Sequence, residues 1–115
     1  MKVIDVGDKV HIITRRLFAE DVRRHFAGEV TAVDGSLVRL EGYVFVLENL
    51  RNEWIRRPEK RSRVLGVADS NHIVNLIPRD VVLDELRYRL SAEKHLMVGD
   101  GQSFALDINE FGSTR

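Results

Sequence analysis

The sequence predicts a mainly β protein, with a small bent barrel over residues 1–78 and a β extension over residues 79–115 packed on the same domain. Three observations lead to this fold class. Short apolar runs recur with turn residues between them, an Asp-Gly pair joins two long alternating runs, and a glycine interrupts the longer of these runs. Such a pattern is typical of small barrels and sandwiches. A chain of 115 residues is long enough for one core and too short for two.

The clearest element is a predicted hairpin over residues 26–48, which turns at Asp34-Gly35. Asp-Gly between alternating apolar runs is a strong hairpin signal, because Gly accepts a positive φ without a steric penalty. Beyond Gly42 both faces of the second arm become apolar, since Tyr43 and Val44 point to opposite sides. Such a strand needs cover on both faces, from the rest of the chain or from another subunit.

Gly42 itself has two interpretations. It marks either the point where one strand bends to serve two sheets, as a small barrel requires, or a simple bulge. The sequence gives both interpretations equal weight.

The stretch before the hairpin predicts one strand and leaves one segment open. Residues 9–18 alternate in polarity and predict a first strand. In the next segment Phe18, Val22 and Phe26 recur every four residues, which suits two turns of helix. Alternatively this segment turns at Glu20-Asp21 and continues directly into the next strand. The sequence slightly favours the turn, because no break separates it from the hairpin.

The stretch after the hairpin predicts three further strands. Residues 48–53 predict a loop, and Trp54-Ile55 begins a strand. Pro58 lacks an N–H, so its neighbourhood belongs at a turn or on an edge. A short strand is expected at residues 64–67, and a buried strand at residues 73–77 that Pro78 ends.

The last third of the chain predicts a β-meander. Asp100-Gly101 repeats the Asp-Gly turn between two alternating runs. A short helix over residues 79–86 is an alternative for the first part of this segment. No internal repeat, low-complexity tract or flexible linker interrupts the chain.

Composition excludes several classes of protein. The chain has no Cys, which rules out disulfides and thiolate chemistry and is compatible with a reducing compartment. No apolar run approaches the length of a membrane-spanning helix. The first ten residues carry acidic side chains where a signal peptide would need an apolar core. We therefore expect a cytoplasmic protein that does not enter a membrane.

No residue pattern indicates catalysis. The four histidines, at positions 11, 25, 72 and 95, do not stand at metal-ligand spacing. Asp107 and Glu110 are separated by an odd number of residues, so in a strand they point to opposite faces and do not converge. The serines lack a nucleophile elbow, and no glycine-rich phosphate loop is present. We expect no enzymatic activity, no metal and no small-molecule cofactor.

The charges are balanced overall but unevenly placed. Residues 1–65 carry 13 Lys/Arg against 10 Asp/Glu, and residues 66–115 carry 5 against 8. The densest basic stretch, residues 51–63, contains Arg56, Arg57 and Arg61 beside Trp54. Arginine suits bidentate phosphate contacts and stacking on bases, and Trp can add a stacking platform. A solvated face with interleaved glutamates explains the same stretch without a ligand.

Phe26, Gly28, Val30, Val33 and Asp34 form an apolar and glycine pattern that ends in Asp, and the stretch from Ser70 to Pro78 reads SNHIVNLIP. These two patterns resemble the first and second motifs of the Sm-like proteins, bacterial Hfq among them, which are small bent barrels of the SH3-like class. The resemblance covers about residues 9–78.

The resemblance implies an SH3-like or Sm-like bent barrel and places two loops on nucleic acid. These loops would be residues 34–37, with Asp34 and Leu37, and residues 69–72, with Asn71 and His72. Most Sm-like proteins carry an Asn after the first-motif Asp, and this chain has no counterpart there. The chain also continues for 37 residues beyond Pro78.

Two hypotheses of function follow. The first is a non-enzymatic, homo-oligomeric barrel that binds RNA or another single-stranded nucleic acid through Asp34, Leu37, Asn71, His72, Arg56, Arg57 and Arg61. The second is a structural or protein-interaction module without a nucleic-acid role. In the second, the doubly apolar strand is buried in an interface, and the basic loop pairs with acidic segments of neighbouring subunits.

Overall fold

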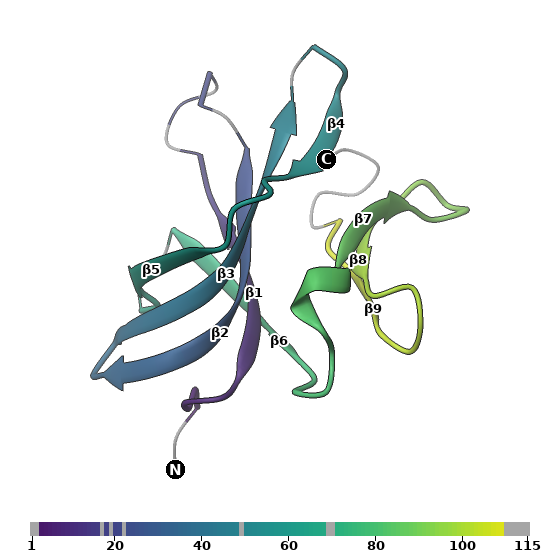
Figure 1. Ribbon diagram of the computed structural model, residues 1–115. Helices are drawn as coiled ribbons and strands as arrows, with labels where there is room; N and C mark the ends of the chain where they lie inside the picture. The colour runs from purple at the N-terminus through teal and green to yellow at the C-terminus, as the bar shows by residue number, and fades with distance from the viewer. Residues whose placement is uncertain are drawn as a thin grey trace. The chain divides into compact units, whose positions relative to one another are not determined.

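The structure of the chain is a computed structural model, and it describes residues 3–16, 18, 20–21, 23–48, 50–68 and 71–109. Its strands confirm the predicted mainly β fold class (Figure 1). The chain divides into two compact units, residues 1–79 and residues 80–115.

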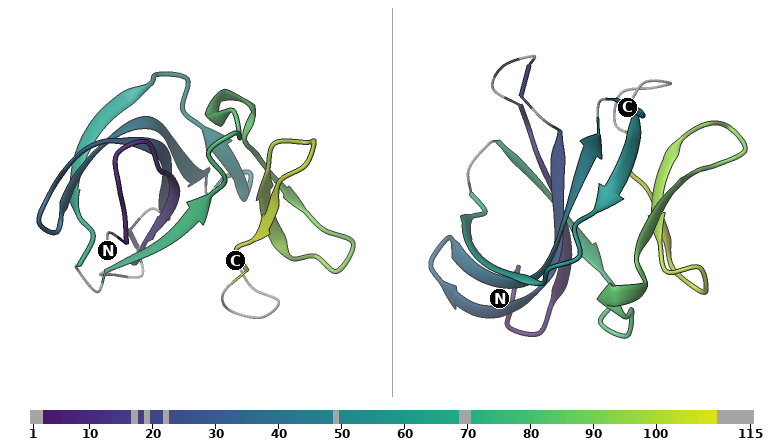
Figure 2. Two further views of the ribbon diagram at one scale, coloured as in Figure 1. Left: turned by 90° about the horizontal axis from the view of Figure 1, so that it is seen from below. Right: turned by 45° about the horizontal axis from the view of Figure 1, so that its top comes forward.

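The first unit is one strongly curved antiparallel sheet (Figure 2). Its strand order is β4-β3-β2-β1-β6, and β5 also pairs with β3. The strands are β1 (Lys9–Thr14), β2 (Arg24–Asp34), β3 (Leu37–Glu48), β4 (Glu53–Arg56), β5 (Arg61–Gly66) and β6 (His72–Ile77). Among the described residues, β5 and β6 each pair with a single strand, so they form two ends of the curved sheet.

The core lies on the concave face of this sheet. Its buried members are Val10, Ile12, Phe26, Val30, Val38, Leu40 and Val44. They alternate along β1, β2 and β3, as a strand with one face on a core requires. The alternation in the sequence therefore identified the residues of this face.

The bend of β3 at Gly42 resolves the two interpretations of that glycine. Up to Gly42 one edge of β3 pairs with β5, and from Phe45 on the same edge pairs with β4. Across the other edge Gly42 lies opposite Gly28 of β2. The strand therefore changes partner beside Gly42, and the register shift lies in β2 between Val30 and Ala32. No bulge lies at Gly42 itself, and the change of partner agrees with the first interpretation, except that both partners belong to one sheet.

Two glycines face each other at this bend because no side chain fits there. A Cβ on Gly42 would overlap the carbonyl oxygen of Ala27 and lie 2.5 Å from the Cα of Gly28. A Cβ on Gly28 would lie 2.7 Å from the ring of Phe26. The backbones of β2 and β3 therefore approach more closely here than any L side chain would allow.

The structure corrects two strand predictions in the first unit. Strand β5 begins at Arg61 rather than residue 64, because Arg61 and Ser62 already pair with β3 after the Pro58 turn. Strand β6 is half-buried rather than buried, with Leu76 59% exposed, because only one strand flanks it.

The open segment before the hairpin follows the favoured interpretation where the structure describes it. Strand β2 begins at Arg24, so Phe26 is already in the strand, and Asp21 caps a turn through the backbone N–H of Phe18. The alternative helix depended partly on Val22, which lies outside the described residues.

The second unit is the predicted β-meander. It contains a short 3₁₀ helix, η1 (Leu83–Glu85), and the antiparallel strands β7 (Arg87–Leu90), β8 (Leu96–Gly99) and β9 (Ala105–Asp107) in the order β7-β8-β9. Gly101 has φ +77°, as the Asp-Gly turn requires. The carboxylate of Asp100 accepts hydrogen bonds from the backbone N–H groups of Gln102 and Phe104 and fixes this turn.

We expect Gly42→Ala to lower the free energy of unfolding by about 3 kcal/mol or more, because the new methyl group overlaps backbone atoms that cannot move independently. Urea denaturation followed by tryptophan fluorescence measures this change.

Gly66→Ala is the matched control for this prediction. Gly66 also lies in a strand paired with β3, but its Cβ would meet only the Leu37 side chain at 3.8 Å. Gly66→Ala should lower the free energy of unfolding far less than Gly42→Ala does. Equal losses in the two variants would contradict the close approach at Gly42.

Candidate nucleic-acid interface

Three arginines lie on the core-facing side of the curved sheet. Arg24 stands two residues before Phe26 on β2, and Arg61 and Arg63 on β5 lie opposite Gly42 and Leu40. Residues directly opposite each other in adjacent strands share a face, so all three side chains point to the side that holds the core. We call Arg24, Arg61 and Arg63 the basic cluster.

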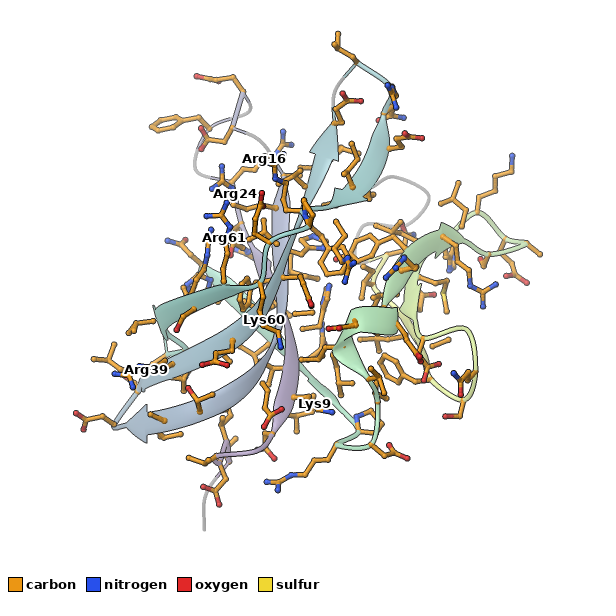
Figure 3. The ribbon with its side chains drawn as sticks, viewed as in Figure 1. Lys9, Arg16, Arg24, Arg39, Lys60 and Arg61 are labelled. Atoms are coloured by element: carbon orange, nitrogen blue, oxygen red, sulfur yellow. The ribbon has the colours of Figure 1, made fainter. Side chains whose placement is uncertain are left out.

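The basic cluster closes over one part of the core. The guanidinium of Arg63 lies over the Phe26 ring, 5.6 Å from its centroid. Arg61 keeps 45% of its side chain exposed and has one weak ion pair, at 3.9 Å, with Glu59. Figure 3 shows Arg24 and Arg61 on the same part of the first unit. The cluster therefore combines an apolar contact, made by Arg63 on Phe26, with the exposed cationic groups of Arg24 and Arg61.

Arg63 is under electrostatic strain. Partial burial lowers its pKa, and the positive charges of Arg61 and Arg24 lower it further. An arginine stays protonated at neutral pH in such surroundings, so this repulsion is carried by the folded protein. A bound anion would relieve this repulsion.

The bend of the sheet brings the cluster together. On a flat sheet Arg24 would be four residues and two strands away from Arg61, about 16 Å between Cα atoms. The Arg63 guanidinium nevertheless reaches across β3 to the ring of Phe26, two residues from Arg24, so the curvature and the long side chains shorten this separation.

A polar pair continues the interface next to Arg24. Thr14 lies opposite both Arg24 and His72, on β2 and β6 respectively. The Thr14 hydroxyl and His72 Nδ1 are 3.3 Å apart, and the backbone N–H of Arg15 donates to the carbonyl of Asn71 at 2.8 Å. This places Asn71 and His72 roughly 10 Å from Arg24, two strand spacings away.

Asp34 and Leu37 lie elsewhere, at the tip of the β2–β3 hairpin. They form its last residue pair, and Gly35 between them has φ +61°. Both are exposed, Leu37 to 49%. Their neighbour Gly35 lines an apolar groove rather than the basic cluster.

This apolar groove, with a cavity volume of about 630 Å³, is lined by Val3, Ile4, Val33, Gly35, Val38, Val67, Ala68, Val74 and Leu76. Several of these side chains also pack against the core, so the groove is a second opening onto it. Its walls come from the N-terminal segment, the β2–β3 hairpin, the segment after β5, and β6.

Arg56 and Trp54 lie on the opposite face of the sheet. Arg56 stacks over the ring of Tyr43, 4.3 Å from its centroid, and Trp54 lies against the His25 ring with centroids 4.3 Å apart. Tyr43 and Phe45 on this face are buried, which confirms that the second arm of the hairpin is covered on both sides.

The seven residues predicted from the sequence therefore divide among several places. Arg61 belongs to the basic cluster, Asn71 and His72 lie beside it, Asp34 and Leu37 lie at the hairpin tip, and Arg56 lies on the other face. Arg57 is exposed just after β4, and Asp69 of the predicted loop lies outside the described residues. Arg24 and Arg63 were not among the residues predicted to bind. Arg24 stands on the same face of its strand as Phe26, and Arg63 lies opposite Leu40. These relations would have assigned both arginines to the core-facing side, but only if the pairing of the strands had been known.

The carboxylate of Asp107 has a partner that the sequence did not indicate. His95, just before β8, has its Nδ1 2.8 Å from this carboxylate at the end of β9, and a backbone hydrogen bond from Asn109 and this histidine lower the pKa of Asp107. Glu110, the carboxylate considered together with Asp107, lies outside the described residues. In the described part of the chain, no group of three or more acidic or histidine side chains is arranged to hold a metal ion.

Comparison with known protein families, curated proteins and solved structures gave no match. The Sm-like resemblance therefore depends on the residues quoted above and stays a prediction. Within the described residues, no helix has the length and apolar character needed to cross a membrane.

Two buried histidines lie beneath Arg56 and Trp54 on the second face. The rings of His11 and His25 meet edge to face at 5.1 Å. Burial lowers the pKa of His11 from 6.5 to about 4. Burial, and then the charges of His11 and Arg23, lower the pKa of His25 to about 3. Both imidazoles are therefore neutral in the folded protein at neutral pH.

Acidification should destabilise the fold through these histidines. Below pH 6.5 the unfolded chain binds protons that the folded chain does not, so the free energy of unfolding falls as the pH drops from 6.5 towards 4. His25→Phe should reduce this pH slope by up to about 1.4 kcal/mol per pH unit, because one titrating group is gone. Urea denaturation at a series of pH values measures it.

Phe45→Leu is the control for this pH prediction. Phe45 lies directly opposite His25 and does not titrate, so its change should lower stability by a constant amount at every pH. An unchanged slope in His25→Phe would show that His25 is accessible to protons in the folded state.

Proposed function

We propose that this chain is a non-enzymatic binding protein for single-stranded nucleic acid, with RNA as the expected ligand, and that the basic cluster is its phosphate contact. The observation that supports this most is the convergence of Arg24, Arg61 and Arg63, from two strands, on one side of the curved sheet. Guanidinium groups bind phosphate oxygens through paired hydrogen bonds. The Thr14–His72 pair beside Arg24 adds further polar groups.

The balance of charge agrees with a local site. The whole chain has a net charge of zero, so no overall field attracts a polyanion. Binding must therefore come from a place where cations outnumber carboxylates. The basic cluster has three guanidinium groups, against one carboxylate, that of Glu59, at 3.9 Å from Arg61.

We expect the protein to bind a short single-stranded RNA at low salt, with affinity that falls as salt rises. Arg61→Ala should weaken binding and reduce the slope of log K against log salt by about 0.7, the value for one lost contact to a single strand. Fluorescence anisotropy with a labelled oligonucleotide at several NaCl concentrations measures both quantities.

Two variants test whether the site is the basic cluster. Arg39→Ala removes an exposed arginine from the same β3–β5 ladder but from the opposite face, and it should leave the slope unchanged. Arg56→Ala alters the second face, where Arg56 covers Tyr43. If Arg39→Ala or Arg56→Ala reduced the affinity for RNA as much as Arg61→Ala does, a binding site at the basic cluster would be contradicted. If the wild-type protein bound no RNA at low salt, the proposal would be overturned.

A second candidate function is a protein-interaction module that assembles with copies of itself and binds no nucleic acid. The apolar groove favours it, because Leu76 of β6 lines the groove and remains 59% exposed. An edge strand such as β6, which pairs with one strand only among the described residues, is a place where another chain can add a strand. Self-assembly is also compatible with the first proposal, so RNA binding separates the two.

We expect light scattering after size-exclusion chromatography to give a mass that is a multiple of the monomer. Leu76→Lys should shift this mass towards the monomer, because it places a charge at the edge of the apolar groove. Val64→Lys, at another exposed apolar side chain that lies outside the groove, is the control. A monomeric wild type would contradict assembly through this groove.

A further inference from the structure

The basic cluster is compact rather than extended. Arg61 and Arg63 lie two residues apart on one strand and on one face, and Arg24 lies on the same face of β2, two residues before Phe26, whose ring the Arg63 guanidinium covers. A protein that tracks the backbone of a single strand needs cations spread along a groove, so that successive phosphates are met in turn. Two guanidinium groups side by side on one strand, with a third on the same face, instead match one group of high negative charge.

A phosphate monoester has this character. At neutral pH it carries a charge near −1.5 to −2 and three acceptor oxygens, whereas the diester inside a strand carries a single charge. Two or three arginine forks can bind one monoester simultaneously. The Thr14 hydroxyl next to Arg24 is a further donor.

We propose that the basic cluster binds the terminal phosphate monoester of a single-stranded nucleic acid, so that the protein prefers strand ends carrying a phosphate over internal positions. This inference rests on the proposed function and specifies its ligand. Arg24, Arg61 and Arg63 hold the phosphate, and the strand leaves past Thr14 and His72 along the start of β6.

The test compares one RNA sequence in three forms, with a 5′-phosphate, with a 3′-phosphate and with hydroxyl groups at both ends. We expect one of the phosphorylated forms to bind about tenfold more tightly than the hydroxyl form, and the two phosphorylated forms show which end is used. Inorganic phosphate should compete with the phosphorylated form at concentrations that leave binding of the hydroxyl form unchanged.

Variants separate a phosphate site from a general attraction of charge. Arg63→Lys keeps the positive charge but loses the planar fork, so it should abolish most of the preference for the phosphorylated end while retaining binding of the hydroxyl form. Arg24→Gln should lower both the preference for the phosphorylated end and the affinity for the hydroxyl form. Arg39→Lys, on the opposite face, should leave both the end preference and the affinity for the hydroxyl form unchanged. Thermal unfolding of each variant confirms that it is folded.

The outcomes distinguish the two proposals. Equal affinity for all three forms would overturn the end preference and leave single-strand binding in place. A preference that survives unchanged in Arg63→Lys and Arg24→Gln would overturn the assignment to this cluster. Failure of every RNA form to bind would overturn the proposed function together with this inference.

Discussion

The close approach of two backbones at Gly28 and Gly42 is the constraint on which the first unit depends. Strand β3 is twelve residues long, and one of its edges pairs with β5 along the first half and with β4 along the second. Beside this change of partner, β2 approaches β3 so closely that a Cβ on Gly42 would overlap the carbonyl oxygen of Ala27. Curvature of the sheet then encloses Phe26, Leu40 and Val44 on its concave side.

The core-facing side of the sheet carries two surfaces of different chemistry. Near Phe26 the basic cluster lies over the core, because Arg24, Arg61 and Arg63 stand on the same face of their strands as the core residues. Elsewhere the apolar groove reaches Val38. An anion suits the basic cluster, and an apolar surface suits the groove. The nucleic-acid binding and the self-assembly that we propose would therefore use separate parts of the first unit.

Prediction from the sequence succeeded where the information was local. The hairpin at Asp34-Gly35, the strand containing Trp54, and the meander with its Gly101 turn all depend on residues close together in the chain. It was less accurate for β5 and β6, where the start of one strand and the burial of the other depend on their neighbours in the sheet. The contact between His95 and Asp107 was missed for the same reason, because it joins the residue before β8 to the end of β9, and the register of these strands was unknown.

The sequence by itself determined the class of fold, the concave apolar face and the presence of many arginines, because alternation, turn chemistry and composition are properties of the chain. Only the tertiary structure decided which arginines meet. Arg61 was among the predicted binding residues, but its neighbours Arg24 and Arg63 were not, and Arg56 lies on the other face over Tyr43. The physical reason is the bend at Gly42, which brings together side chains that a flat sheet would hold about 16 Å apart.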